Sequence, residues 1–279
     1  MKNSKFFFSA IIISLLLVAC STMPLTGRRQ ISLIPTSTML SMSFQQYKTF
    51  LDSNQVIASG KEAAMVQRVG QKLAGAAENY LTDKKLGDEI KNFDWEFKLV
   101  KSDEVNAWCM PGGKIVVYSG ILPLTQTEAG LAVVIGHEIG HALAHHGNER
   151  MSQGLMTQLG GVALSVALQE KPAQTQQIWM AAFGLGAQFG MLLPYSRLHE
   201  YEADQFGLTL MTMAGYEPQE SVTFWERMSK LGGAKPPEFA STHPADEKRV
   251  AQLKKLLPKM EKFKPQNSTV TKKEEERKK

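Results

Sequence analysis

Apolar side chains recur at helical spacing near the start of the chain. Residues 37–53 and 61–80 carry them three and four positions apart, as at Val66, Val69 and Leu73. This period is typical of a helix with one buried face. The pattern therefore predicts two amphipathic helices.

The hydrophobic period changes to two further along the chain. Residues 93–99 alternate between apolar and polar side chains, and residues 114–118 form a short β-branched run, as expected of two strands. A Pro-Gly-Gly sequence between them predicts a turn, so residues 93–118 are expected to form a small antiparallel sheet. Because everything after Thr127 reads as helix, the predicted fold class is α+β and predominantly helical.

The first 20 residues are typical of an export signal. Two lysines precede an apolar stretch of 14 residues, which is short for a bilayer span but matches a signal-peptide core. Residues 1–19 are therefore predicted to be a signal peptide. The Leu-Val-Ala-Cys sequence that ends at Cys20 resembles the lipobox of bacterial lipoproteins, which implies that Cys20 is acylated. An ordinary signal peptide cut near Ala19 is the alternative.

The segments on either side of the predicted domain differ from it in composition. Residues 20–36 are small, polar and proline-containing, which is typical of a tether. Residues 37–264 are predicted to form the folded domain, and residues 265–279 are charged enough to be disordered. Ser21 stands where Asp would favour retention in the inner membrane. The lipobox resemblance therefore implies a bacterial envelope protein anchored in the outer membrane and facing the periplasm.

Two apolar segments, residues 155–168 and 178–195, have some character of membrane helices. The first is too short to span a bilayer, and the second contains Gln188 and Pro194 and lacks a clear charged flank on its N-terminal side. We therefore expect buried helices or a flap that faces the membrane. Whether this part of the chain is a lid, core or membrane contact is left open by the sequence.

The net charge of +5 comes from the two ends of the chain. Lys2 and Lys5 precede the apolar stretch, and residues 254–279 hold ten basic against four acidic residues, which leaves the body slightly acidic. This distribution argues against nucleic-acid binding. If Cys20 is acylated, Cys109 has no disulfide partner. No base or cation adjoins Cys109 to activate its thiol, so we expect a packed structural cysteine.

The segment with the clearest chemistry is an HExxH motif within an apolar run. On a helix, His137 and His141 lie one turn apart on one face, so both imidazoles can bind one metal ion. Glu138 is displaced by about 100° and can address a water molecule on that metal. Three ionisable groups in an apolar helix need partners, and metal binding provides them.

A catalytic zinc site also needs a third protein ligand and one open position. His145 lies about 12 Å along the helix from His137 and is too far away to share the metal. It and His146 are expected to form a solvated helix end. The third ligand must therefore come from another segment.

The segment from 196 to 204 offers such a ligand. Glu200 and Asp204 are again four residues apart, so one carboxylate can bind the metal while the other accepts a hydrogen bond from a ligand histidine. The spacing alone leaves Glu202 as an alternative ligand.

An HExxH motif followed some sixty residues later by an SRxxExxAD-like segment resembles the gluzincin zinc metallopeptidases related to HtpX, BepA and the CAAX prenyl proteases. Residues 21–30 resemble the periplasmic lipoprotein members of the LoiP and YcaL kind. The likeness covers residues 61–250. It implies a zincin-like fold with the sheet beside the HExxH helix, one zinc ion per chain, Glu200 as the third ligand, and Asp204 orienting His137.

Two further segments extend the resemblance. Residues 106–115 are similar to the family's edge-strand segment, NAFxxPGGxI, which implies that substrate binds there as an added β-strand. The residues with this implied role are Asn106, Ala107, Gly112 and Gly113. Thr242-His243-Pro244 with Arg249 resembles the HPxxxxR element, whose histidine approaches the active site in some members. A helix N-terminus is the alternative for His243.

Two functions compete on this basis. The first is a zinc-dependent endopeptidase that cleaves unfolded or misassembled envelope proteins, with Glu138 as general base and His243 or Arg197 stabilising the oxyanion. The second is a zinc-stabilised periplasmic chaperone or assembly factor with latent protease activity, in which His243 occupies the open metal position. Outer-membrane assembly machinery is a candidate partner. A structural lipoprotein with a degenerate site is disfavoured, because the ligand set is intact.

Overall fold

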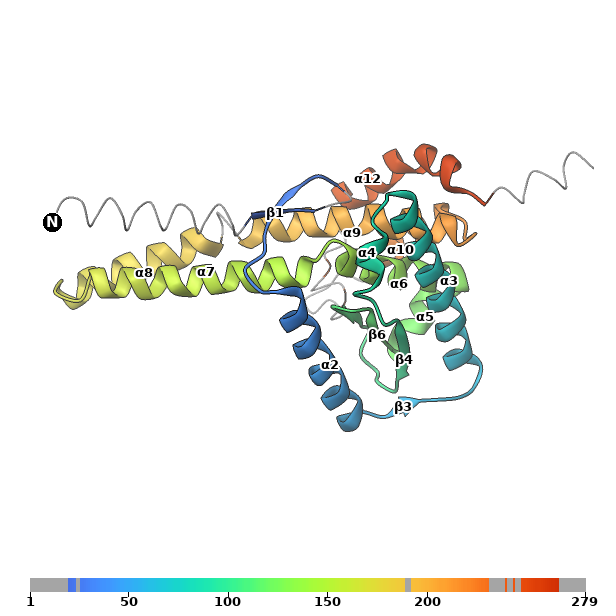
Figure 1. Ribbon diagram of the computed structural model, residues 1–279, viewed down its shortest axis with the longest axis horizontal. Helices are drawn as coiled ribbons and strands as arrows, with labels where there is room; N and C mark the ends of the chain where they lie inside the picture. Colours follow the sequence, from blue (N-terminus) through green and yellow to red (C-terminus); the bar gives the residue numbers. More distant parts are fainter. Residues whose placement is uncertain are drawn as a thin grey trace, which may run out of the picture. The chain divides into compact units, whose positions relative to one another are not determined.

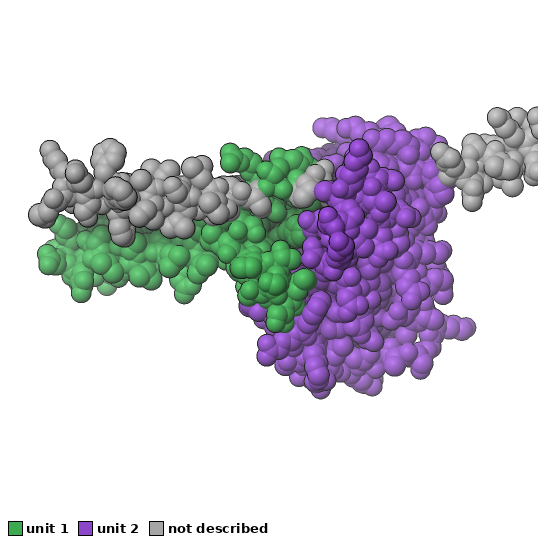
Figure 2. All heavy atoms as spheres, viewed as in Figure 1, with its two compact units in different colours: residues 1–41, 144–199 green, residues 42–143, 200–279 purple. Residues whose placement is uncertain are grey.

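The computed structural model describes residues 20–23, 26–188, 192–230, 239, 243 and 247–265 (Figure 1). The chain divides into two compact units, coloured separately in Figure 2. Unit 1 comprises residues 1–41 and 144–199, and unit 2 comprises residues 42–143 and 200–279. The predicted signal peptide and all but the first residue of the predicted tail lie outside the described residues, so both stay predictions.

Unit 2 combines a four-stranded sheet with most of the helices. Its strands are β3 (Val56–Ile57), β4 (Glu96–Val100), β5 (Ala107–Met110) and β6 (Lys114–Tyr118). Its helices are most of α2 (Thr36–Ser53), α3 (Lys61–Asp83), α4 (Gly87–Ile90), η1 (Ser119–Ile121), α5 (Leu122–Thr125), α6 (Glu128–Leu143), the part of α9 (Leu193–Met213) from Glu200 onward, α10 (Gln219–Lys230), α12 (Glu247–Leu256) and η3 (Leu257–Phe263). α2 and α3 confirm the two helices predicted from apolar spacing.

The sheet is mixed, so the expectation of an antiparallel sheet is wrong for one strand pair. β5 and β6 are antiparallel, with Ala107 opposite Val117, and so are β3 and β4. β4 and β6 are parallel, with Phe97 opposite Ile115. Because the strand order is β3-β4-β6-β5, β6 lies beside β4 and β5 forms the edge. Alternating side chains could not reveal this, since parallel and antiparallel strands share a period of two.

Helices pack on both faces of the sheet. On one face, Tyr47 of α2 forms a buried cluster with Val100 and Val116. On the other face, α3 packs against β4, where Gly70 lies directly on the ring of Phe97. α6 also packs against β5 and β6. This arrangement places the HExxH helix next to the edge strand.

Unit 1 is built around a pair of helices. β1 (Cys20–Thr22) pairs with β2 (Arg29–Ile31), β2 packs against α7 (His146–Ala167), and α7 packs against α8 (Ala173–Ala187). The expectation of buried helices is wrong here, because Leu159 is 59% and Val166 is 65% exposed. Among the described residues, no helix is long and apolar enough to cross a membrane.

One of the two histidines predicted to be solvated, His146, is instead part of a buried cluster in unit 1. His145 has a left-handed φ of 53°, which interrupts the helix after α6. Helical spacing counted from α6 therefore does not predict which side chains are buried beyond His145. His146 is 0% exposed and stacks on His199 with ring centroids 4.1 Å apart. The Nε2 atom of His199 is 2.9 Å from Glu149, and Arg28 donates to both oxygens of the same carboxylate. The expectation for His146 is therefore wrong.

The buried carboxylate of Glu149 predicts a loss of stability in acid. Burial raises its pKa, but hydrogen bonds from His199 and Arg28 outweigh burial and hold the pKa at about 2, below the usual 4.5. A lowered folded-state pKa stabilises the fold fully above about pH 4.5, and this contribution, roughly 3 kcal/mol, is lost as the pH falls towards 2. Urea unfolding should show the free-energy difference between wild type and Glu149→Gln shrinking from pH 7 to pH 2.5. A difference independent of pH would contradict this account.

Candidate metal centre

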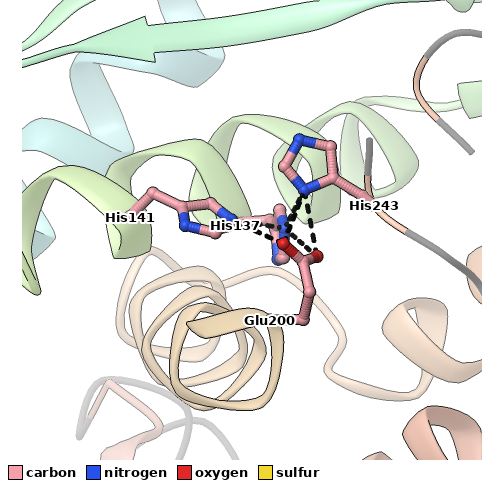
Figure 3. A group of neighbouring side chains, drawn as sticks. All are labelled: His137, His141, Glu200 and His243. Carbon is pink, nitrogen blue, oxygen red and sulfur yellow. Dashed lines mark hydrogen bonds and ion pairs between the residues drawn. The ribbon is translucent and has the colours of Figure 1, made fainter. Parts of the chain in front are cut away.

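Four side chains of unit 2 converge on one point (Figure 3). His137 and His141 come from α6, Glu200 comes from α9, and His243 comes from the segment before α12. All four residues are buried, and one donor atom of each lies within 4.8 Å of the other three. Distances between donor atoms are 3.1 Å for His137 Nε2 to His141 Nε2, 3.2 Å for His137 Nε2 to Glu200 Oε2, 3.3 Å for His141 Nε2 to Glu200 Oε1, and 2.9 Å for His243 Nδ1 to Glu200 Oε2.

These separations fit a metal ion. Tetrahedral bonds of about 2.1 Å place neighbouring ligand atoms about 3.4 Å apart, close to the observed spacing. When His137 donates from Nδ1 to Asp204, its Nε2 carries a lone pair that points at the Nε2 of His141. Two facing nitrogens beside a carboxylate offer a set of ligands to a cation. Imidazole and carboxylate donors in this number suit zinc.

The two helices that supply the ligands approach closely because small residues line their contact. A Cβ at Gly140 would lie 2.6 Å from the carbonyl oxygen of Ala203. A Cβ at Gly207 would lie 2.8 Å from the backbone nitrogen of His137. Glycine at these positions therefore lets α9 bring Glu200 within reach of the histidines on α6.

Substituting Gly140 by alanine should separate the two helices. We expect Gly140→Ala to lower the free energy of unfolding by about 1–3 kcal/mol through overpacking and to weaken zinc binding. Gly75→Ala, in the middle of α3, is the matched control, since a Cβ there meets nothing within 4 Å. It should stabilise the protein by about 0.5–1 kcal/mol. Urea unfolding and zinc competition titration check both, and equal behaviour of the two variants would contradict the helix-contact argument.

Asp204 and Arg249 contact His137 on the side of its Nδ1 atom. Asp204 Oδ1 is 2.9 Å from His137 Nδ1, as expected for the orienting carboxylate. Arg249 donates to Asp204 Oδ1 at 2.8 Å, its Nη1 is 3.0 Å from Glu200 Oε2, and its guanidinium lies 3.6 Å from the ring centroid of Trp225. The sequence pointed to Arg249 only as part of a motif. Its contacts could not be read from the sequence, because they join segments 45 and more residues apart.

The carboxylates of the centre are ionised at neutral pH. Burial raises the pKa of Glu200, but hydrogen bonds from His137, His141 and His243 outweigh burial and hold the pKa far below its usual range. Burial likewise raises the pKa of Asp204, and the nearby charge of Arg249 reverses this effect. The centre therefore presents fixed negative charge to a cation.

Glu138 lies beside the donor atoms and next to the edge strand. It is 3% exposed, and its Oε1 is 3.5 Å from Nε2 of His243. Burial, followed by the charge of Glu138, raises the pKa of Cys109 on β5 well above its usual value. A protonated thiol is a poor nucleophile, which agrees with the structural cysteine expected from the sequence.

The remaining predicted residues are placed as follows. Asn106 precedes β5 and accepts a hydrogen bond from the backbone N–H of Tyr118 through its carbonyl oxygen. Ala107 begins β5 and is 1% exposed. Gly112 and Gly113 have φ of 87° and 81° and form the β5–β6 turn. These positions build the edge strand, and their contact with substrate stays a prediction.

The structure also shows where the alternative metal ligand, Glu202, and the alternative oxyanion residue, Arg197, lie. Glu202 is 7% exposed but is not among the four residues that converge in the described part of the chain. Arg197 is exposed and belongs to unit 1, and its role at an oxyanion stays a prediction.

Comparison with known proteins bears directly on this centre. The model of peptidase family M48 matches residues 60–257. The chain belongs to peptidase family M48. This confirms the resemblance inferred from the HExxH and SRxxExxAD-like motifs. The M48 match includes His137, His141, Glu200, His243, Asp204 and Arg249.

Several M48 proteins show the extent of the similarity. The chain is 37% identical to the mitochondrial metalloendopeptidase OMA1 of Schizosaccharomyces pombe over 61% of its own length and 48% of that protein. It is 28% identical to the metalloprotease YcaL of Escherichia coli over 91% of its own length and 97% of YcaL. It is also 28% identical to the E. coli β-barrel assembly-enhancing protease, over 57% of its own length and 34% of that protein. The chain thus spans about half the length of the fungal OMA1 proteins that it matches.

Proposed function

We propose that this M48 protein is a zinc-dependent endopeptidase that hydrolyses peptide bonds in unfolded or misassembled proteins of the bacterial cell envelope. The observation that carries the proposal is the convergence of His137, His141 and Glu200, with donor atoms 3.1 to 3.3 Å apart. Two of the relatives are a metalloendopeptidase and a metalloprotease, which supports peptide hydrolysis. The name of the β-barrel assembly-enhancing protease supports a role near outer-membrane assembly.

Each residue of the centre has a role in this mechanism. His137, His141 and Glu200 would hold one zinc ion, which when bound would lower the pKa of a water molecule and polarise the scissile carbonyl. Glu138 accepts the proton of the attacking water and passes it to the leaving amine. Asp204 accepts the hydrogen bond from Nδ1 of His137, so that the lone pair of Nε2 faces the other donor atoms.

The edge strand provides a means to select unfolded chains. Among the described residues, β5 pairs with β6 on one side only, and α6 packs beside it. An extended peptide that adds to β5 is recognised through its backbone, and a folded protein cannot present such a strand. We propose that the protein is lipid-anchored through Cys20 to the outer membrane, on the periplasmic side, where misassembled outer-membrane proteins and their assembly machinery are available as partners.

His243 contributes a fourth donor atom to the centre in this structure. Its Nδ1 lies 3.1 Å from His137 Nε2 and 2.9 Å from Glu200 Oε2, whereas a catalytic zinc site needs that position for water. We therefore expect His243→Ala to raise the initial rate of peptide cleavage about threefold to tenfold. A lower rate would instead support a role for His243 at the oxyanion.

The presence of His243 as a fourth donor also favours a second candidate function, a zinc-stabilised chaperone or assembly factor with latent protease activity. An assay on the mature chain, from residue 20, separates the two candidates. We expect the protein to cut reduced, unfolded casein into fragments visible by mass spectrometry and to leave a folded, disulfide-bonded protein intact. If neither wild type nor His243→Ala cleaves casein while carrying one zinc ion per chain, the endopeptidase proposal is wrong.

A further inference from the structure

The helical hairpin formed by α7 and α8 exposes large apolar side chains. Leu159 and Val162 on α7 are 59% and 58% exposed, and Ile178 and Trp179 on α8 are 61% and 56% exposed. α8 has no buried residue, and it packs against α7. Contiguous exposed apolar surface of this kind marks a site of interaction with a partner or a membrane.

The hairpin carries almost no charge. Between Arg150 and Arg197 the only charged residues are Glu170 and Lys171, although 21% of the whole chain is charged. Both lie in the connection between α7 and α8. Moving α8 and the part of α7 from Met151 onward out of water would therefore bury no charged group along either helix.

The directions of these side chains favour lipid over a protein surface. Neighbouring residues on a helix point about 100° apart, so Ile178 and Trp179 face different sides of α8. A protein partner covers both only with a groove or with more than one element. Lipid chains close around both, and tryptophan is enriched where the headgroups meet the acyl chains.

The length of the apolar surface defines how the hairpin can meet a bilayer. The exposed stripe on α7 from Leu155 to Val166 is about 17 Å long, and the hydrocarbon core is about 30 Å thick. No described helix is long and apolar enough to cross a membrane. The hairpin therefore fits an orientation in the plane of the interface, with its apolar side chains among the acyl chains and its charged connection at headgroup level.

Unit 1 also contains the residue predicted to carry lipid. β1 begins at Cys20 and pairs with β2, and β2 packs against α7. Arg28, directly before β2, is tied to Glu149 of α7 by hydrogen bonds of 2.9 and 2.7 Å. Cys20 and the hairpin are thus parts of one compact unit, so both can contact the same leaflet.

We propose that the α7–α8 hairpin is a lipid-binding surface that docks unit 1 onto a membrane independently of acylation at Cys20. Because the surface is apolar and almost uncharged, its binding should depend little on anionic lipid or on salt. This separates it from electrostatic attraction by the basic C-terminal residues, which weakens as salt rises.

Vesicle flotation of the chain from residue 20, with Cys20→Ser to prevent acylation, tests this proposal. The expected result is binding to pure phosphatidylcholine vesicles that changes less than twofold between 50 and 500 mM salt. Leu159→Glu combined with Trp179→Glu should lower the partition coefficient at least tenfold, since two buried apolar side chains are lost. The matched control is Gln169→Glu with Gln174→Glu, which adds the same charge at exposed positions beside the charged connection and should leave binding within about threefold of the parent.

Three results would overturn the proposal. The first is a parent protein that binds only vesicles containing phosphatidylglycerol, which would indicate electrostatic attraction. The second is equal loss of binding in both double variants. The third is a parent that binds no vesicles and is a dimer by sedimentation velocity. If Leu159→Glu with Trp179→Glu converted this dimer to a monomer, the hairpin would bind a second copy of the chain and not lipid. Circular dichroism melting confirms that each variant is folded.

Discussion

Glu138→Gln should lower kcat for peptide cleavage by about 10²–10⁴-fold while one zinc ion per chain stays bound. Glutamine keeps the size and the hydrogen-bonding capacity of the side chain but cannot accept the proton of the attacking water. Glu138 is also not among the four converging donors, so its replacement should leave the ligands in place. Initial rates on unfolded casein, with zinc measured in the same samples, check this prediction.

An exposed glutamate of the same unit provides the control for this experiment. Glu62→Gln, in the first turn of α3, removes an equal charge away from the donor atoms and should cleave casein at the wild-type rate. If Glu138→Gln kept more than about a tenth of wild-type kcat, Glu138 would not be the general base. Loss of zinc from Glu138→Gln would instead show that its carboxylate helps to hold the metal.

Glu200→Gln should weaken zinc binding more than 100-fold, whereas Glu202→Gln should leave it unchanged. The two residues form a matched pair, since both lie on α9 and each is 7% exposed. Glu200 contacts His137 and His141, and among the described residues the four converging donors include Glu200 and not Glu202. Loss of a residue that merely supports a ligand costs about 10–100-fold in metal affinity, and loss of a charged ligand should cost more.

Competition titration with a chelator of known zinc affinity measures both dissociation constants. Glu200→Gln should also lose activity at a zinc concentration that saturates the wild type and regain part of it at higher zinc. If Glu202→Gln lost the metal and Glu200→Gln retained it, the alternative that the spacing left open would be the correct ligand assignment.

Local patterns were sufficient to predict the local parts of this fold. Apolar spacing predicted α2 and α3 nearly to their ends, and the β-branched run predicted β6 over its five residues. The motif on α6 and the carboxylates on α9 were found because one helical turn brings residues i and i+4 to one face. The choice of Glu200 as the carboxylate that faces the histidines rested on family resemblance and not on spacing.

Features that depend on long-range contacts could not be predicted. The parallel pairing of β4 with β6 depends on β6 lying beside β4 while β5 forms the edge, and no strand encodes this order by itself. Arg249 looks like a surface residue of a basic helix, yet it is 1% exposed because Asp204 and Glu200 balance its charge. The helices over 155–187 are apolar enough to suggest a core, and only the structure shows that their apolar side chains are exposed.

The central claim is that a zinc ion held by His137, His141 and Glu200 is required for peptide hydrolysis. Metal analysis of the purified mature chain, combined with the casein assay on the same sample, tests it most directly. The account predicts one zinc ion per chain, loss of cleavage when a chelator removes it, and recovery when one equivalent of zinc is returned. Cleavage that persists in zinc-free protein, or a pure protein that binds no stoichiometric zinc, would contradict the account.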